Sequence, residues 1–175
     1  MTGPHAHSAR GQRKFAVSLF ADLTGYTALC ERLDPEDVER AINPLMAGME
    51  AAVSRESGLV INVAGDGLFA LFGAPEALPD SPTRAVRAAE RIRTMVAATS
   101  SAMPGLALPD VHIGIAAGEI LLTSSSSRGS WSVIGASVNL SSRLCGAAES
   151  GEVLVDDGCH ELAGQQFIWD APRSL

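Results

Sequence analysis

The amino-acid sequence predicts an α+β domain with a ferredoxin-like βααββαβ core, in which helices flank an antiparallel-rich central sheet. Three observations lead to this fold class. Apolar runs of strand length alternate with amphipathic helical stretches. The tripeptide Gly-Asp-Gly at residues 65–67 separates two such runs and predicts a β-hairpin. The chain has 175 residues, of which 46% are hydrophobic, enough for one domain with a substantial core.

The helix expected before the hairpin has the clearest signals of the N-terminal half. Asp34 suits its N-cap and Pro35 its first helical position, while Gly58 is expected to end it. Pro44 is a residue that can kink a helix. In chain order, the expected elements are a strand over residues 15–21, a helical stretch after 24–27, this helix to about 56, two strands flanking 65–67 and a helix over about 84–96.

The C-terminal half is expected to add strands and two further helices. In chain order, we expect a loop over residues 100–109, a strand over 111–117 with a hairpin partner over 119–123, a flexible excursion over 124–130, a strand over 131–134, a helix to about 148, a strand over 152–155, a helix over 157–163 and a last strand over 166–169. Gly135 is expected to separate the strand over 131–134 from the helix after it.

One domain is expected over residues 14–170, between a flexible leader over 1–13 and a tail over 171–175. The leader lacks the apolar core of a signal peptide. No run approaches the roughly 18 apolar residues of a membrane span, so no membrane insertion is expected. The net charge of −7 argues against a protein that coats nucleic acid.

The three cysteines are odd in number and far apart, so they fit neither a disulfide framework nor a metal motif. They predict buried thiols in a reducing cytoplasm. His112 and His160 belong to no metal-spacing motif and are expected to be structural.

Two aspartates stand at the ends of apolar runs that are predicted to be strands. Asp22 follows the run over residues 15–21, and Asp66 stands at the tip of the predicted hairpin, each directly before a loop or turn. A carboxylate at the end of a buried strand is costly unless its charge is compensated. Two such carboxylates on neighbouring strands would make a site for a hard divalent cation such as Mg²⁺.

Four motifs follow one another along the chain: LFADLTGYT at residues 19–27, AGDGLFALFG at 64–73, HIGIAAGE at 112–119 and VIGASVNLSSRL at 133–144. Together they resemble the catalytic domain of class III nucleotidyl cyclases of the bacterial type, which make cyclic AMP or cyclic GMP. The resemblance covers roughly residues 15–169. One of these motifs alone would be weak evidence for the family, whereas four in order are strong evidence.

The resemblance implies a metal site with two ions, Mg²⁺ or Mn²⁺. Asp22 and Asp66 look like the metal-binding pair, and the main-chain carbonyl of Leu23 looks like a further ligand. In the family, each site lies between two chains, so the resemblance also implies a homodimer. A fused or partner sensor domain is a further expectation, because bacterial members often carry one.

The resemblance also assigns positions around the nucleotide. Gly25, Tyr26 and Thr27 look like a turn that presents backbone N–H groups to the triphosphate. Asn139 and Arg143 look like the pair that orients the ribose and stabilises charge on the α-phosphate. The resemblance implies that the partner chain supplies this pair together with the base-recognising positions. The spacing of four residues between Asn139 and Arg143 in a helix independently places both on one face.

Two of the positions that recognise the nucleotide base in the family depart from the family pattern. Adenylyl cyclases usually have a lysine where this chain has Asn62, and an aspartate or threonine where it has Ser132. Neither residue resembles the glutamate and cysteine of guanylyl cyclases. Asn62 could read a purine edge or hold its strand, and Ser132 discriminates poorly by itself.

The first functional hypothesis is a purine nucleotidyl cyclase, with ATP favoured over GTP. The alternative is a weak or inactive cyclase-like domain that binds nucleotide or serves as a regulatory dimerisation module. It is motivated by Asn62, Ser132 and the absence of a Leu-Lys-Gly segment that contacts the terminal phosphates in many members; Lys14 is the only lysine. A diguanylate cyclase is a weaker alternative, because the sequence has no Gly-Gly-Asp-Glu-Phe signature.

Overall fold

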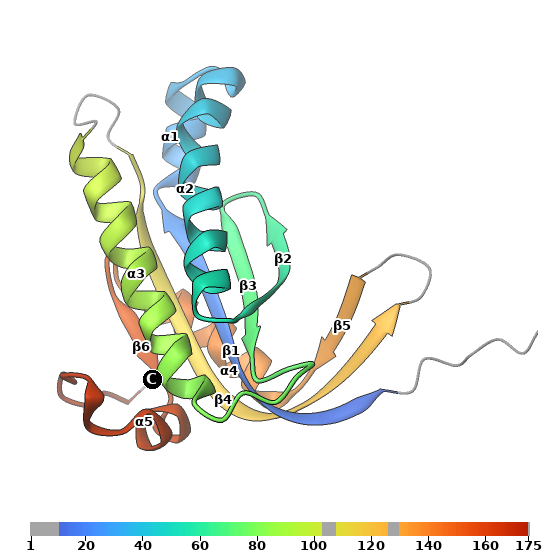
Figure 1. Cartoon of the computed structure of the whole chain (residues 1–175). Coiled ribbons are helices and arrows are strands. Elements are labelled where there is room, and N and C mark those ends of the chain that lie inside the picture. The colour runs from blue at the N-terminus through green and yellow to red at the C-terminus, as the bar shows by residue number, and fades with distance from the viewer. Residues whose placement is uncertain (1–10, 103–107, 126–129, 175) are drawn as a thin grey trace, which may run out of the picture.

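The computed structural model describes residues 11–102, 108–125 and 130–174. Its elements are β1 (Gln12–Thr24), α1 (Tyr26–Arg32), α2 (Pro35–Arg55), β2 (Leu59–Ala64), β3 (Gly67–Phe72), α3 (Ser81–Ala102), β4 (Asp110–Ser125), β5 (Ser130–Ile134), α4 (Ala136–Ala147), β6 (Val153–Val155), α5 (Asp157–Ala163) and a 3₁₀ turn (Gly164–Gln166), as Figure 1 shows. Parts of the predicted leader (1–10), loop (103–107), excursion (126–129) and tail (175) lie outside the described residues.

The strands form one six-stranded sheet with the order β2-β3-β1-β4-β5, and β6 pairs with β4 off this path. Every pairing is antiparallel except that of β4 with β6. Helices cover the sheet on both sides (Figure 1). The predicted α+β class, with an antiparallel-rich sheet flanked by helices, is therefore confirmed.

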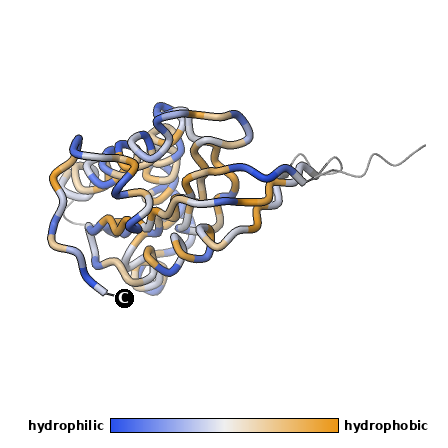
Figure 2. Tube along the Cα trace, turned by 90° about the horizontal axis from the view of Figure 1, so that it is seen from below, coloured by the Kyte–Doolittle hydropathy of each residue, from blue (hydrophilic) through white to orange (hydrophobic). Residues whose placement is uncertain are grey.

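One face of the sheet carries the main core. Val17, Leu19 and Ala21 alternate along β1 and are buried in a cluster with apolar residues of α2 and α3. Because neighbouring residues of a strand point to opposite faces, Phe20 and Asp22 lie on the other side. Figure 2 shows long hydrophobic stretches in the middle of the molecule, with most of the strongly hydrophilic residues around them.

Helix α4 covers part of that second face. A Cβ atom at Gly114 of β4 would overlap the backbone of Ser141 and Cys145, and one at Gly118 would lie 3.1 Å from Cβ of Ser137. These glycines therefore let α4 lie directly on the backbone of β4. Beside α4, a smaller buried cluster occupies the same face and contains Ala16, Leu71, Ala74, Ile120 and Leu122.

The predicted hairpin between residues 111–117 and 119–123 is wrong. Both segments belong to the single strand β4, which pairs with β1 without interruption from Gln12 opposite Leu122 to Thr24 opposite Asp110. Gly118 marks the close approach of α4 rather than a turn. The ladder with the long strand β1 keeps β4 extended through this glycine.

The chain after α5 also differs from the prediction. Residues 166–169 form no strand; a 3₁₀ turn ends at Gln166, and Phe167 and Trp169 pack against the main core. The indole N–H of Trp169 donates to the carbonyl oxygen of Gly164, at 3.2 Å. Side-chain packing rather than a strand ladder therefore holds this segment.

The ends of two helices differ from expectation as well. Ser57, with φ of 61°, follows α2 in the left-handed conformation expected of Gly58. Gly58 is selected by space instead, because a Cβ there would lie 2.6 Å from the ring of Phe72. Helix α2 continues through Pro44, and α3 extends through Ala102 into the predicted loop.

The cysteines are only partly as predicted. Cys145 and Cys159 are buried, whereas Cys30 in α1 is exposed. None of the helices in the described ranges is long and apolar enough to cross a membrane.

Candidate functional site

Asp22 and Asp66 are brought together where β1 passes the β2–β3 hairpin. Asp22 lies opposite Gly67, the residue directly after Asp66. Asp66 stands in the turn between β2 and β3, as predicted. Asp22 does not follow its strand, as we expected, but lies within it, because β4 pairs with β1 as far as Thr24. Cross-strand pairing therefore holds its backbone.

The charge of Asp22 acts directly on Asp66. Burial raises the pKa of the Asp66 carboxyl, and the negative charge of Asp22 raises it further. The charge of Asp66 is in turn the smallest of the causes that raise the pKa of Tyr26, after its hydrogen bond to Cys30, the charge of Cys30 and burial. Two carboxylates that repel each other in this way favour a cation between them.

The donors available here fit a hard cation such as Mg²⁺. Magnesium is commonly bound by one or two carboxylates, with substrate phosphates and water completing its octahedron. In the described part of the chain, no group of three or more His, Cys, Asp and Glu side chains could hold a metal. Asp22 and Asp66 would thus supply the side-chain oxygens. The pairing of β1 with β3 ends at Asp22, so no residue of β3 lies opposite the main chain of Leu23.

The turn at Gly25 leads from β1 into α1. Gly25 has φ of 90°, and a Cβ atom there would meet nothing within 4 Å, so backbone conformation and not crowding selects glycine. The carbonyl of Gly25 accepts a hydrogen bond from the N–H of Leu29. The N–H groups of Tyr26 and Thr27 belong to the first turn of α1, where they have no acceptor within the helix.

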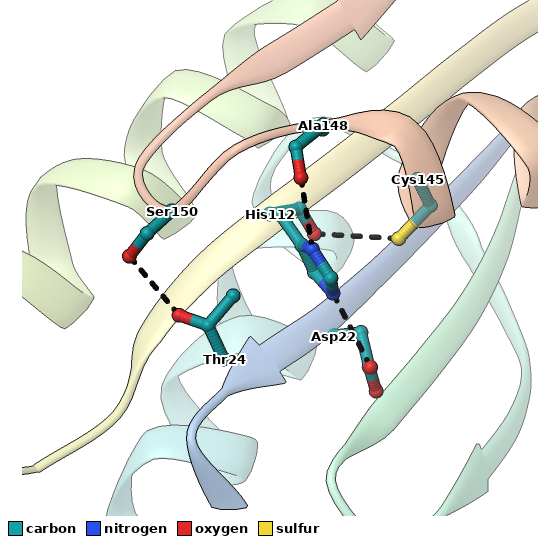
Figure 3. Close-up of polar contacts among 6 residues, drawn as sticks. All are labelled: Asp22, Thr24, His112, Cys145, Ala148 and Ser150. Carbon is teal, nitrogen blue, oxygen red and sulfur yellow. Dashed lines mark hydrogen bonds and ion pairs between the residues drawn. The ribbon is translucent and has the colours of Figure 1, made fainter.

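His112 contacts Asp22, and the sequence did not predict this contact. It lies opposite Asp22 in the β1–β4 ladder, and its Nε2 is 3.3 Å from Oδ2 of Asp22. Its Nδ1 is 3.2 Å from the carbonyl oxygen of Ala148, just after α4 (Figure 3). Ninety residues separate His112 from Asp22, so no local motif could have signalled the contact.

Asn139 and Arg143 both lie in α4, and both are exposed. Their four-residue spacing places them on one face of the helix, as predicted. In the ranges that the structure describes, neither makes a hydrogen bond or ion pair with Asp22 or Asp66. A single chain therefore does not join this pair to the two aspartates.

Asn62 and Ser132 lie on strands at the two ends of the β2-β3-β1-β4-β5 order, in β2 and β5 respectively. A bulge between Val60 and Asn62 sets Asn62 opposite Phe69, on the face of the sheet that carries Asp22. Ser132 is flanked by Trp131 and Val133, which pack against the smaller cluster. Strand alternation therefore points Ser132 to the opposite face. Both side chains are exposed.

These motifs and this architecture define a family. The chain belongs to the adenylate and guanylate cyclase catalytic domain family, whose model matches residues 11–171. This confirms the resemblance to class III cyclases.

Individual relatives of the chain agree with this family assignment. An uncharacterized protein of Mycobacterium tuberculosis (strain ATCC 25618 / H37Rv) is 31% identical over 160 residues, which are 89% of this chain and 28% of the relative. An adenylate cyclase of Mycobacterium bovis is 29% identical over 87% of this chain and 34% of its own length. The crystal structure of the guanylyl cyclase Cya2 matches with a TM-score of 0.87 and 29% identity, over 95% of this chain and 86% of that one. The chain thus spans about a third or less of these curated relatives.

Proposed function

We propose that residues 14–170 form a catalytic domain that converts a purine nucleoside triphosphate to its 3′,5′-cyclic monophosphate and pyrophosphate. The observation that carries this proposal is the proximity of Asp22 to Asp66 where β1 passes the β2–β3 hairpin. The side chain of Asp22 is 46% exposed, so its carboxylate can reach a ligand. Because the chain belongs to the adenylate and guanylate cyclase family, we assign this carboxylate pair to metal binding.

Asp22, Asp66 and the main-chain carbonyl of Leu23 would hold two Mg²⁺ or Mn²⁺ ions together with the substrate phosphates. When bound, such ions activate the ribose 3′-hydroxyl and neutralise charge on the leaving pyrophosphate. The protein then needs no covalent nucleophile. Its own groups have to position the triphosphate in line with the hydroxyl.

Residues of α1 and α4 would complete this arrangement. Gly25 turns the backbone so that the N–H groups of Tyr26 and Thr27 face the triphosphate. Arg143 stabilises charge on the phosphoryl oxygens with a permanently charged planar group, and Asn139 orients the ribose. Both α4 side chains are exposed, so they can serve a site outside their own chain.

A homodimer follows from this division of roles, because one chain does not join Asn139 and Arg143 to the aspartates. A twofold axis would create two equivalent sites. Two aromatic side chains on the face that carries Asp22 support the dimer. The rings of Phe20 and Phe69 stack there with centroids 4.4 Å apart, and both residues are only partly buried.

ATP is the favoured substrate and GTP the less favoured one. The Asn62 amide can donate and accept hydrogen bonds at a purine edge, and it lies on the same face as Asp22. Neither Asn62 nor Ser132 matches the glutamate and cysteine pair of guanylyl cyclases. A longer protein with a sensor domain is part of the proposal, since the chain covers 28% of its mycobacterial relative.

Incubation of the purified chain with ATP or GTP and Mn²⁺ tests the activity. We expect cyclic nucleotide and pyrophosphate in equal amounts, and no product from the Asp22→Ala variant. Asp170→Ala, at an exposed position near the C-terminus, is the matched control and should remain active. Absence of product from either triphosphate, with an intact dimer, would refute the proposal.

A regulatory or nucleotide-binding dimer without turnover is the second candidate. The observation in its favour is that Ser132 points away from the face shared by Asn62 and Asp22. Calorimetry with ATP and Mn²⁺, combined with product analysis, separates the two candidates. Dimerisation and binding without product support the second candidate, whereas sustained turnover excludes it.

A further inference from the structure

The imidazole of His112 bridges two parts of the molecule that are distant in sequence. Its Nε2 contacts Oδ2 of Asp22 at 3.3 Å, and its Nδ1 contacts the carbonyl oxygen of Ala148 at 3.2 Å (Figure 3). A carboxylate and a carbonyl oxygen both accept hydrogen bonds, so each ring nitrogen of His112 lies beside an acceptor. The ring therefore links Asp22 of β1 to the end of α4.

The surroundings of His112 hold the ring in place. Only 17% of its side chain is exposed, and its neighbours Val111 and Ile113 are fully buried. The thiol of Cys145 in α4 donates to the main-chain oxygen of His112, at 3.4 Å. The N–H of Ala148 donates to carbonyl oxygens of the last turn of α4. Both the backbone of His112 and its second hydrogen-bond partner are therefore anchored.

A second contact ties the segment after α4 to the end of β1. The hydroxyl groups of Thr24 and Ser150 lie 3.1 Å apart (Figure 3). The hydroxyl of Ser150 also donates to Oδ2 of Asp110, at 3.3 Å. Asp110 lies opposite Thr24 in the ladder. The carbonyl that orients His112 thus belongs to a segment attached to the strand that carries Asp22.

The two oxygens of the Asp22 carboxylate have different surroundings. Oδ2 contacts His112, whereas Oδ1 lies 3.1 Å from the position that a Cβ atom would occupy at Gly67. Gly67 directly follows Asp66 in the chain, so Oδ1 lies beside the residue that adjoins the second carboxylate. The contact with His112 leaves this oxygen available to a cation shared with Asp66.

We propose that His112 is a positioning residue of the cation site, which holds Oδ2 of Asp22 so that Oδ1 faces the cation. The inference rests on the proposed function and adds to it a residue that acts through Asp22. Outer hydrogen-bond partners of this kind orient metal ligands and limit the conformations that binding must select. A purely structural role for His112 would instead affect folding alone.

The test measures Mn²⁺ binding to the full chain without nucleotide. Calorimetry and the paramagnetic resonance signal of free Mn²⁺ are the two readouts. We expect His112→Ala to weaken Mn²⁺ binding about 10-fold or more, as removal of an outer partner typically does. His160→Ala is the control, because His160 lies in α5 against Trp169 and should bind as wild type does. Thermal unfolding in EDTA verifies that each variant is folded.

Two conservative variants separate positioning from packing. The side-chain nitrogen of glutamine can replace Nε2, which faces Asp22, whereas that of asparagine can replace only Nδ1, which faces Ala148. His112→Gln should therefore recover most of the Mn²⁺ affinity and His112→Asn should not. In an Asp22→Asn background, His112→Ala should weaken Mn²⁺ binding no further.

The outcomes are distinguishable. Wild type that binds no Mn²⁺ would overturn the proposed cation site together with this inference. Wild type that binds Mn²⁺, with unchanged affinity in folded His112→Ala, would overturn the inference alone. Equal recovery by glutamine and asparagine, or full additivity with Asp22→Asn, would also overturn it.

Discussion

Asp22 of β1 lies directly opposite Gly67 of β3, and a Cβ atom at residue 67 would stand 3.1 Å from Oδ1 of Asp22. This separation is tighter than ordinary van der Waals contact. The absence of a side chain at residue 67 therefore gives the Asp22 carboxylate its space. Because Gly67 also follows Asp66, the hairpin positions one carboxylate and makes room for the other.

Gly67→Ala should weaken Mn²⁺ binding, because the added methyl group displaces the Asp22 carboxylate from the side that faces Asp66. The expected loss of affinity is several-fold, with little change in thermal stability in EDTA, since the nearest backbone oxygen is 3.6 Å away. Calorimetric titration with Mn²⁺ measures the loss. In an Asp22→Asn background the same substitution should have almost no further effect; an equal loss there would contradict this explanation.

Asp66→Asn should stabilise the metal-free protein at neutral pH. Burial and the charge of Asp22 raise the pKa of Asp66 in the folded state above its value in the unfolded chain. The folded state thus holds the proton more tightly, and the contribution of this group to stability falls as the pH rises through the two pKa values. Asparagine carries no charge, so the variant avoids this loss.

Thermal unfolding in EDTA across pH 3 to 8 measures the difference between Asp66→Asn and wild type. The variant should be the more stable protein above the raised pKa, and the difference should shrink in acid. Added Mn²⁺ should raise the unfolding temperature of wild type but not of the variant. A variant that is less stable at pH 7 in EDTA would contradict the assigned repulsion.

Gly114→Ala should destabilise the fold strongly, because the new Cβ would overlap the backbone of Ser141 and Cys145. Overpacking of this kind typically costs about 1–3 kcal/mol or more, since backbone must move. Gly146→Ala within α4 is the control: a Cβ there meets nothing within 4 Å, and alanine in a helix is more stable by roughly 0.5–1 kcal/mol. Urea unfolding compares the two; similar stabilities would contradict the close packing of α4 on β4.

Cys30 should be the one thiol of the native chain that reacts quickly with Ellman's reagent. Burial raises the pKa of Cys145 and of Cys159 to about 12, so both remain protonated and shielded. One equivalent should react in the folded protein and three in denaturant. Loss of the fast equivalent in Cys30→Ser identifies the residue, and fast reaction of two thiols would show that the packing around α4 or α5 is looser than described.

The β2–β3 hairpin and the start of α2 were predictable because their signals are local. Asp66 occupies a turn in which Gly65 has a φ of 62°, and Pro35 begins a helix at the position its ring allows. The same local reasoning failed at Gly118, where a glycine in an apolar run suggested a turn. The glycine instead accommodates α4, a contact that the neighbouring sequence does not encode.

The sequence by itself determined the family, the hairpin that carries Asp66, and the motif around Asp22. These depend on residue types in short segments and on their order along the chain. Tertiary structure alone decided that His112 contacts Asp22. It also decided that Asn62 lies on the same face of the sheet as Asp22, whereas Ser132 lies on the opposite face. Strand register and a bulge decide these relationships, since a shift of one residue turns a side chain to the opposite face.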